Sequence, residues 1–121
     1  MHKVMLVEDD PTMLSLLKTL MEIEGFQVVN VVDFEQIIDE IRQNIPDLIL
    51  LDVHLGDISG FEVLEKLRQD EQLQNVVVIM SSGMDVQKQC IEKGADDFVL
   101  KPYMPDELIM KIKQKIVERL N

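Results

Sequence analysis

Acidic, hydroxyl and basic side chains follow the short apolar runs of this sequence. The residues in these positions are Glu8, Asp9 and Asp10 after the first run, Asp52 after the third, Ser81 and Ser82 after the fourth, and Lys101 and Pro102 after the fifth. Clustered carboxylates repel one another at neutral pH unless protons or a cation intervene. Oxygen ligands without histidine or cysteine clusters favour Mg²⁺, Mn²⁺ or Ca²⁺ over zinc, and a site with few protein ligands suits Mg²⁺ best. We therefore predict a Mg²⁺ site at Glu8, Asp9 and Asp52.

The same residues predict phosphoryl transfer to an aspartate. Asp52 beside a divalent cation can act as a nucleophile and form an acyl phosphate, while Lys101 neutralises charge on the phosphoryl oxygens. Ser81 would donate a hydrogen bond to the phosphoryl group. Any one of these residues alone is more often a cap or a surface group, so the hypothesis depends on the agreement of several strand ends. Asp10 is interpreted as a helix N-cap because Pro11 follows it.

Five apolar runs define the elements that must hold these side chains. The runs are Val4–Val7, Val28–Val32, Leu48–Leu51, Val76–Met80 and Phe98–Leu100. They are continuous rather than alternating, which is typical of parallel strands covered by helices on both faces. Apolar residues at helical spacing fill the intervals, for example from Phe34 to Ile45 and from Ile109 to Leu120. The pattern predicts five repeats of a strand followed by a helix.

The order of the strands decides which side chains meet. Right-handed crossovers allow the order 2-1-3-4-5, in which the first and third strands are neighbours at the centre of the sheet. Ligands of such sheets bind beyond the carboxyl ends of the strands. We expect an α/β fold, a doubly wound parallel five-stranded sheet of the flavodoxin-like type, forming one domain over residues 1–121.

Composition excludes several classes of function. The 121 residues contain 12 Lys and Arg against 23 Asp and Glu, a net charge of −11 that repels nucleic-acid phosphates and anionic lipids. The longest apolar run, Val76–Met80, has five residues, too few to span a membrane. No signal-peptide core precedes Glu8. A single cysteine, Cys90, excludes an internal disulfide, and we expect a cytoplasmic protein.

The motifs resemble those of the receiver domain of two-component response regulators, and the resemblance extends from Lys3 to about Leu120. The closing block is the most specific of the four matching segments. The segments are Val7–Asp10 for the acidic pair, Leu50–Asp52 for the phosphoacceptor, Ile79–Ser82 for the hydroxyl strand and Gly94–Pro102 for the closing block.

The resemblance implies a phosphorylation-driven switch. Asp52 would accept a phosphoryl group from a sensor histidine kinase or a histidine phosphotransfer protein. Asp9 and Asp52 would bind Mg²⁺ directly, Glu8 would help through water, and the backbone carbonyl of His54 would be a third protein ligand. The protein would not be an enzyme with external substrates, since only Asp52 itself would be phosphorylated and dephosphorylated.

The resemblance also implies how the switch operates. Ser81 and Phe98 match the switch pair, a hydroxyl that moves toward the phosphate and an aromatic ring that turns inward behind it. The surface of the fourth helix, fifth strand and fifth helix would then control a downstream protein, an output domain or a phosphorylation-dependent homodimer. The Lys101–Pro102 peptide bond is expected to be cis.

Four positions depart from the family pattern or modify it. Gly56 replaces a usual proline, so the loop from Val53 to Gly60 is expected to be looser than in relatives. Tyr103 replaces a more frequent phenylalanine and is expected to add a polar contact at the last helix. His54 and Gly83 would flank the path of the water that hydrolyses the acyl phosphate, and the glycine would leave that path open.

Alternative functions share parts of this pattern. A flavin-binding electron carrier has the same strand order, but it needs a loop rich in Ser, Thr and Gly where this chain has three acids. An aspartyl-phosphate hydrolase would need an acidic residue two positions after Asp52, where this chain has His54. Within the receiver hypothesis, a stand-alone protein and an N-terminal receiver excised from a longer regulator both remain open.

Overall fold

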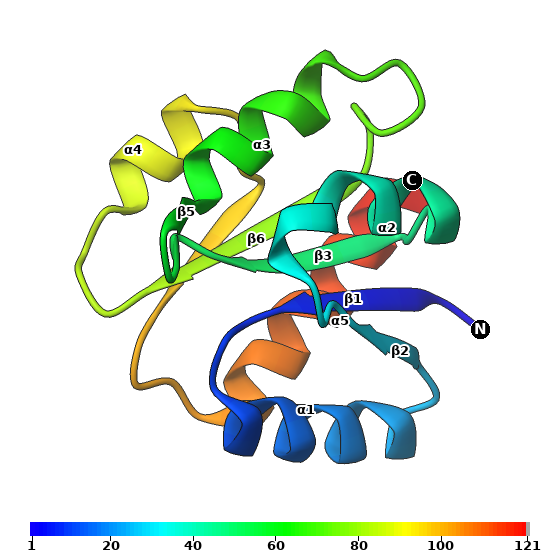
Figure 1. Ribbon diagram of the computed structural model, residues 1–121. Coiled ribbons are helices and arrows are strands. Elements are labelled where there is room, and N and C mark those ends of the chain that lie inside the picture. The colour runs from blue at the N-terminus through cyan, green and yellow to red at the C-terminus, as the bar shows by residue number, and fades with distance from the viewer. Residues whose placement is uncertain (121) are drawn as a thin grey trace.

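A five-stranded parallel sheet forms the centre of the protein in the computed structural model, which describes residues 1–120 (Figure 1). The side chain of Leu120 and the predicted chain end at Asn121 lie outside this description. The strand order is β2-β1-β3-β6-β7, which confirms the predicted order 2-1-3-4-5 because β6 and β7 are the fourth and fifth strands of the sheet. These strands are β1 Lys3–Val7, β2 Gln27–Asn30, β3 Leu48–Asp52, β6 Val77–Ser82 and β7 Asp97–Leu100.

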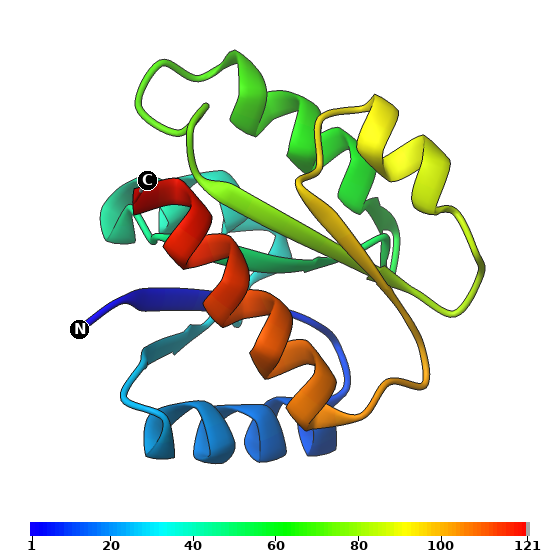
Figure 2. The ribbon, with the colours of Figure 1, turned by 180° about the vertical axis from the view of Figure 1, so that it is seen from behind.

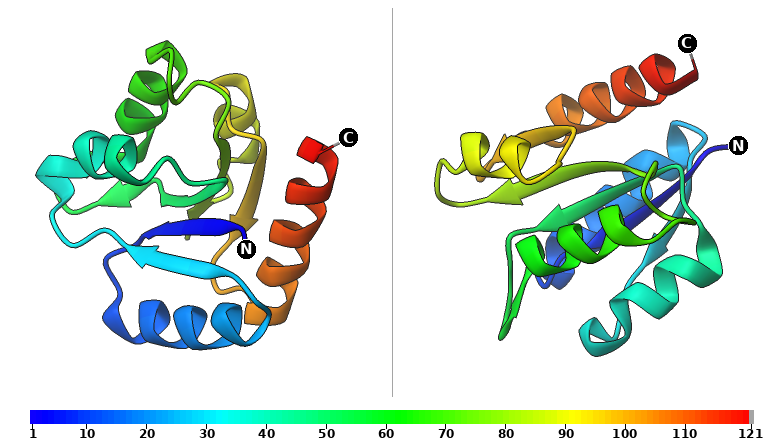
Figure 3. Two further views of the ribbon diagram at one scale, coloured as in Figure 1. Left: turned by 90° about the vertical axis from the view of Figure 1, so that its right-hand side faces the viewer. Right: turned by 90° about the horizontal axis from the view of Figure 1, so that it is seen from above.

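Helices cover both faces of the sheet. They are α1 Pro11–Ile23, the 3₁₀ turn η1 Phe34–Gln36, α2 Ile37–Asn44, α3 Gly60–Gln69, α4 Gln87–Glu92 and α5 Pro105–Leu120. From behind, α5 crosses in front of the sheet with α1 beside it (Figure 2). From above, the sheet separates α5 from the α2 and α3 layer (Figure 3). No helix of the described chain has both the length and the apolar character that a membrane span requires.

Each apolar strand contributes to two separate cores. Met5 and Leu51 pack with α2, α3 and α4, whereas Leu6 and Leu50 pack with α1 and α5. Successive strand residues point to opposite faces, so a strand buried on both sides must be apolar throughout. The continuous apolar runs of the sequence are therefore the direct consequence of this three-layer arrangement.

Side-chain caps fix where the site-bearing helices begin. The Asp10 carboxylate accepts hydrogen bonds from the backbone N–H groups of Thr12 and Met13 at 3.0 and 3.3 Å, with Pro11 as the first residue of α1. This confirms the interpretation of Asp10 as an N-cap. The Ser59 hydroxyl caps α3 by accepting from the Phe61 N–H at 3.2 Å.

The helix predicted between Phe34 and Ile45 differs from the observed one at both ends. It begins as the 3₁₀ turn η1 and becomes α-helical only from Ile37. It ends at Asn44, because Ile45 has a φ of 41° in the left-handed region. Pro46 follows, and a proline disfavours helical backbone in the residue before it. Ile45 is therefore exposed rather than part of the buried stripe.

The segment after Asp52 is more regular than the sequence suggested. Instead of a loose loop, β4 His54–Leu55 pairs in antiparallel fashion with β5 Ile58–Ser59. Gly56 has a φ of 63° in the turn that joins them, a conformation that glycine adopts without strain. Glycine thus permits the tight turn that closes this small hairpin, and a loop looser than in relatives stays a prediction.

An arginine connects three segments at the end of the sheet that carries the amino termini of the strands. The Arg68 guanidinium donates to the carbonyls of Gly94, Gln74 and Val76 at 2.9, 3.0 and 2.7 Å, and to the Asp96 carboxylate at 3.0 Å. Asp96 also accepts from the Val78 N–H at 2.8 Å. Asp96 is thus a structural acid that joins Arg68 to the start of β6.

Replacing Arg68 with alanine should destabilise the fold. Three carbonyls and one carboxylate would lose their charged donor, and we expect the free energy of unfolding to fall by about 2 kcal/mol. Urea denaturation measures this change. Arg42→Ala is the matched control: its ion pairs with Asp39 and Asp70 lie at the surface, so its loss should be clearly smaller. Equal losses in the two variants would contradict this role of Arg68.

Candidate functional site

Three carboxylates meet where β1 and β3 end. Glu8 and Asp9 follow β1, and Asp52 is the last residue of β3; the two strands are paired, with Val7 opposite Leu51. One carboxylate oxygen of each acid lies within 4.8 Å of those of the other two. Glu8 and Asp52 are buried and Asp9 is exposed. The structure thus brings together the three acids that the strand-end argument selected.

Lys101 lies between two of these acids. Its ammonium nitrogen Nζ is 2.7 Å from Oε2 of Glu8 and 2.8 Å from Oδ2 of Asp52. Burial alone would lower the pKa of the Lys101 amine, but the hydrogen bonds and charges of the two carboxylates outweigh it and raise that pKa to about 12. Lys101 therefore remains a cation at neutral pH, in contact with Asp52.

The backbone after β1 holds Glu8 in place. Its Oε1 faces the N–H groups of Asp9 and Asp10, which donate at 3.2 and 3.3 Å. Burial raises the pKa of the Glu8 carboxyl above its usual range, and Asp52 adds to the shift, whereas Lys101 opposes it. Glu8 is thus an oriented, buried acid whose charge depends on a neighbouring cation.

Ser81 faces the same edge from the next strand. β6 pairs with β3 so that Ser81 lies opposite Asp52. Its hydroxyl oxygen Oγ is fully buried and has no hydrogen-bond partner within residues 1–120. A buried hydroxyl without a partner is costly, so it calls for a partner such as water, an ion or a ligand. Phe98, on β7, is buried in the core beneath α3 and α4.

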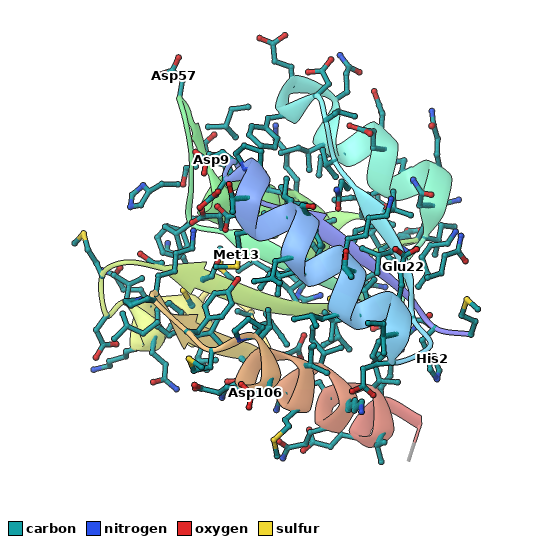
Figure 4. All side chains as sticks on the ribbon, turned by 90° about the horizontal axis from the view of Figure 1, so that it is seen from below. His2, Asp9, Met13, Glu22, Asp57 and Asp106 are labelled. Atoms are coloured by element: carbon teal, nitrogen blue, oxygen red, sulfur yellow. The ribbon has the colours of Figure 1, made fainter. Side chains whose placement is uncertain are left out.

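His54 contacts the acidic cluster through its backbone. Its N–H donates to Oδ1 of Asp52 at 3.3 Å, while its imidazole is exposed. Figure 4 shows the surroundings: Asp9 lies at the amino end of α1, and Asp57, in the turn of the β4–β5 hairpin, projects from the same end of the molecule. His2 lies at the opposite end. The expected cis bond between Lys101 and Pro102 is confirmed.

Tyr103 differs from its predicted role. We expected a polar contact at the last helix, but the ring is buried against α1 and α5, and its hydroxyl has no partner among the described residues. It lines a cavity of about 360 Å³ beside the acidic cluster. The other lining residues are Glu8, Asp10, Met13, Lys101 and Pro102. Burial raises the pKa of Tyr103 to about 12, and the nearby Glu8 carboxylate acts in the same direction.

The charges of the cluster suit a divalent cation. When Glu8, Asp9 and Asp52 are all ionised, the single charge of Lys101 leaves two negative charges unbalanced. All three donors are carboxylate oxygens, the ligands that Mg²⁺, Mn²⁺ and Ca²⁺ prefer. The exposed position of Asp9 leaves room for water ligands. The acidic pocket can therefore hold a hard metal ion.

Comparison with known proteins places this geometry in a family. The sequence matches the response regulator receiver domain over residues 4–113. The chain belongs to this family. It is 40% identical over 114 residues to the transcriptional regulatory protein CpxR of Escherichia coli K12, a match that covers 93% of this chain and 48% of the relative. This membership argues against the flavin carrier and the hydrolase.

Solved receiver domains share the fold. The CheY-like receiver domain protein of Methanospirillum hungatei superposes with a TM-score of 0.88 at 29% identity, covering 98% of this chain and 96% of the other. The N-terminal domain of the nisin resistance regulator NsrR gives a TM-score of 0.84 at 31% identity, covering 95% and 97%. The chain spans about half the length of the curated relatives that it matches.

The sequence pattern did not predict two features near the acidic cluster, the close contact of Gly60 and the buried hydroxyl of Tyr103. Gly60, at the start of α3, lies so close to Asp52 that a Cβ there would be 2.2 Å from the Asp52 carbonyl oxygen. The buried Tyr103 hydroxyl is also new, although the departure from phenylalanine had marked that position. For Gly60, the only signal in the sequence was a glycine immediately after the Ser59 cap.

The titration of Tyr103 should report its burial. It is the only tyrosine, and the chain has no tryptophan, so absorbance near 295 nm isolates it. In the folded protein the phenol should ionise at about pH 12, against 10.0 for an unperturbed tyrosine. Because the folded pKa is raised, the stability that this shift contributes is complete below pH 10 and is lost between pH 10 and 12.

Denaturant provides the control for this titration. The same transition measured in strong denaturant should return to about pH 10. A native midpoint near pH 10, with the fold verified by circular dichroism, would show that the hydroxyl reaches solvent.

Proposed function

We propose that this receiver domain is the phosphorylation-dependent switch of a two-component system, with Asp52 as the phosphoacceptor. The observation that carries the proposal is the position of Asp52: Lys101 contacts its Oδ2 at 2.8 Å, and Ser81, with a buried hydroxyl that lacks a partner, lies opposite it. A nucleophilic carboxylate, a cationic amine and a hydroxyl donor thus lie together at the end of β3. This arrangement serves phosphoryl transfer to a carboxylate.

The proposed transfer follows from this arrangement. An oxygen of the Asp52 carboxylate attacks the phosphorus of a phosphohistidine on a kinase or phosphotransfer protein. The phosphorus–nitrogen bond breaks, its electron pair stays on the imidazole, and Asp52 becomes an acyl phosphate. Lys101 neutralises charge on the transferred oxygens, and the Ser81 hydroxyl donates a hydrogen bond to one of them.

A bound Mg²⁺ would supply charge neutralisation for the phosphoryl oxygens. Asp9 and Asp52 would hold it directly, the His54 carbonyl would be a third ligand, and Glu8 would act through water. Two observations support this assignment: the carboxylate oxygens of the three acids lie within 4.8 Å of one another, and Lys101 leaves part of their charge unbalanced. The family membership also supports it.

The proposed response begins at Ser81 and Phe98. Movement of the hydroxyl toward the phosphoryl group vacates space on β6, and the Phe98 ring turns further inward. Phe98 lies on β7 between α4 and α5 in the chain, so the surface of α4, β7 and α5 changes. Exposed Met84, Leu100 and Met104 in this part of the chain supply apolar contact area.

We propose that residues 1–121 form one receiver domain that acts in the cytoplasm, accepts phosphate from a sensor histidine kinase or phosphotransfer protein, and controls a downstream protein or output domain. A phosphorylation-dependent homodimer is part of this proposal. The 40% sequence identity to CpxR, a transcriptional regulatory protein, supports a role in regulation. The net charge of −11 argues against direct contact of this domain with DNA.

Phosphorylation should occur only at Asp52. Incubation with acetyl phosphate and Mg²⁺ should add one phosphoryl group to the wild type and none to Asp52→Asn, because the amide is not a nucleophile. Intact-mass measurement and peptide mapping give the stoichiometry and the position. Comparable labelling of the folded Asp52→Asn variant, or no labelling of the folded wild type, would overturn the assignment.

Mg²⁺ binding is tested with substitutions of two aspartates at the same end of the molecule. Asp9→Ala should lower Mg²⁺ affinity, measured by calorimetry, by about tenfold or more. Asp57→Ala is the matched control: Asp57 lies in the exposed turn of the β4–β5 hairpin, so its loss should leave the affinity nearly unchanged (Figure 4). Equal losses of affinity in the two variants would show that acidic residues attract the cation only generally, and would contradict a specific site at Asp9.

Gly83 should govern how long the phosphoryl group lasts. A Cβ at this position would meet nothing within 4 Å, so a side chain at position 83 has open space to occupy. We expect Gly83→Leu to obstruct the attacking water and to slow dephosphorylation several-fold, with Mg²⁺ affinity nearly unchanged. Loss of the acyl phosphate is followed after the phosphodonor is removed. A rate equal to or faster than that of the wild type would contradict control of water access at this position.

A further inference from the structure

Gly60 lies against the backbone of the residue that we propose as phosphoacceptor. A Cβ built on Gly60 would be 2.2 Å from the carbonyl oxygen of Asp52 and 3.0 Å from both its carbonyl carbon and Cα of Val53. All three neighbours are backbone atoms, which cannot rotate away as a flexible side chain can. The backbone φ of Gly60 lies outside the left-handed region, so space rather than conformation demands glycine here.

The contact holds a short segment from two sides. The Gly60 N–H donates to the Val53 carbonyl at 2.7 Å, and the Val53 N–H donates to the Ser81 carbonyl at 2.9 Å. Val53 stands between Asp52 and His54, the two neighbours that the proposed function assigns to the metal. The start of α3 and the strand β6 therefore clamp the peptide units on which both ligands are carried.

We propose that Gly60 is a positioning residue, which sets the place of the Asp52 carboxylate and the His54 carbonyl by letting α3 approach the end of β3. This inference rests on the proposed function, because it concerns the same phosphoacceptor. Any side chain at position 60 would force the two backbones apart by about 1 Å, since unbonded carbon atoms pack near 3.5 Å.

Either way of relieving the contact disturbs the site. If the strand end moves, the Asp52 carboxylate moves with it, and its distances to Lys101 and Ser81 change. If α3 moves, the hydrogen bond from Gly60 to Val53 is lost, and the segment up to His54 loses one side of its clamp. The α3 residues Val63, Leu64 and Leu67 are buried, so the helix resists moving as a whole.

The test compares two adjacent substitutions at the start of α3. In Gly60→Ala we expect the rate of phosphorylation by acetyl phosphate to fall by about 100-fold, as a displacement near 1 Å can cause. Mg²⁺ affinity, a readout independent of phosphorylation, should fall by about tenfold. In Ser59→Ala, which removes the cap of α3 without adding atoms, the melting temperature should fall while both site properties remain near those of the wild type.

The outcomes separate this inference from the proposed function. If the wild type is phosphorylated at Asp52 and folded Gly60→Ala matches it in rate and Mg²⁺ affinity, the positioning role is wrong and the function stands. If Ser59→Ala loses the site properties as fully as Gly60→Ala, the effect belongs to helix stability, and the positioning role is again wrong. A folded wild type that accepts no phosphoryl group overturns the function itself.

A measurement on the wild type covers the case in which Gly60→Ala does not fold. Hydrogen exchange of the Gly60 amide should slow when Mg²⁺ is added, because ligation at Asp52 and His54 tightens the segment to which this amide is bonded. The amide of Phe61, which is bonded to the Ser59 hydroxyl, serves as the internal comparison and should change less. Unchanged exchange at Gly60 upon saturation with Mg²⁺ would overturn the proposal.

Discussion

Repulsion among the carboxylates at the junction of β1 and β3 is the constraint around which the site is organised. Glu8 and Asp52 are buried, and burying two negative charges together is unfavourable unless a cation accompanies them. Lys101, directly after β7, provides that cation, and β7 is two strands away from β3 in the sheet. The pairing works only if β1, β3 and β7 all end at the same edge, and that requires the parallel, doubly wound sheet.

The remainder of the fold keeps that edge in place. Two apolar cores, one on each face, fix the strands, and the same strands supply both because their side chains alternate between the faces. At the far end, Arg68 connects α3, the segment before β6 and the segment before β7. The sheet thus presents a charged edge where a cation and a phosphoryl group can enter.

The close approach of α3 to the end of β3 is a second constraint on the positions of the site residues. At Gly60 the start of α3 nearly touches the Asp52 carbonyl, and the residue between the proposed ligands is hydrogen bonded to α3 on one side and to β6 on the other. The small β4–β5 hairpin lies between Asp52 and this helix in the chain. A segment that could have been a free loop is therefore held at both ends, which limits how far the proposed metal ligands can move.

The sequence by itself determined the repeating elements, the strand order and the residues that gather at the sheet edge. These follow from local information: apolar periodicity, caps such as Asp10, and the rule that parallel strands share one carboxyl edge. The chemistry of the residues suggested the roles of Asp52 and Lys101, and the resemblance to receiver domains added the expected roles of the His54 carbonyl and of the pair Ser81 and Phe98. The tertiary structure decided that Lys101 bridges Glu8 and Asp52, that the Tyr103 hydroxyl is buried, that Asp96 serves Arg68, and that Gly60 contacts Asp52. These contacts join segments far apart in the chain or fold back over a hairpin, and their distances depend on strand register and helix packing, which spacing along the chain does not specify.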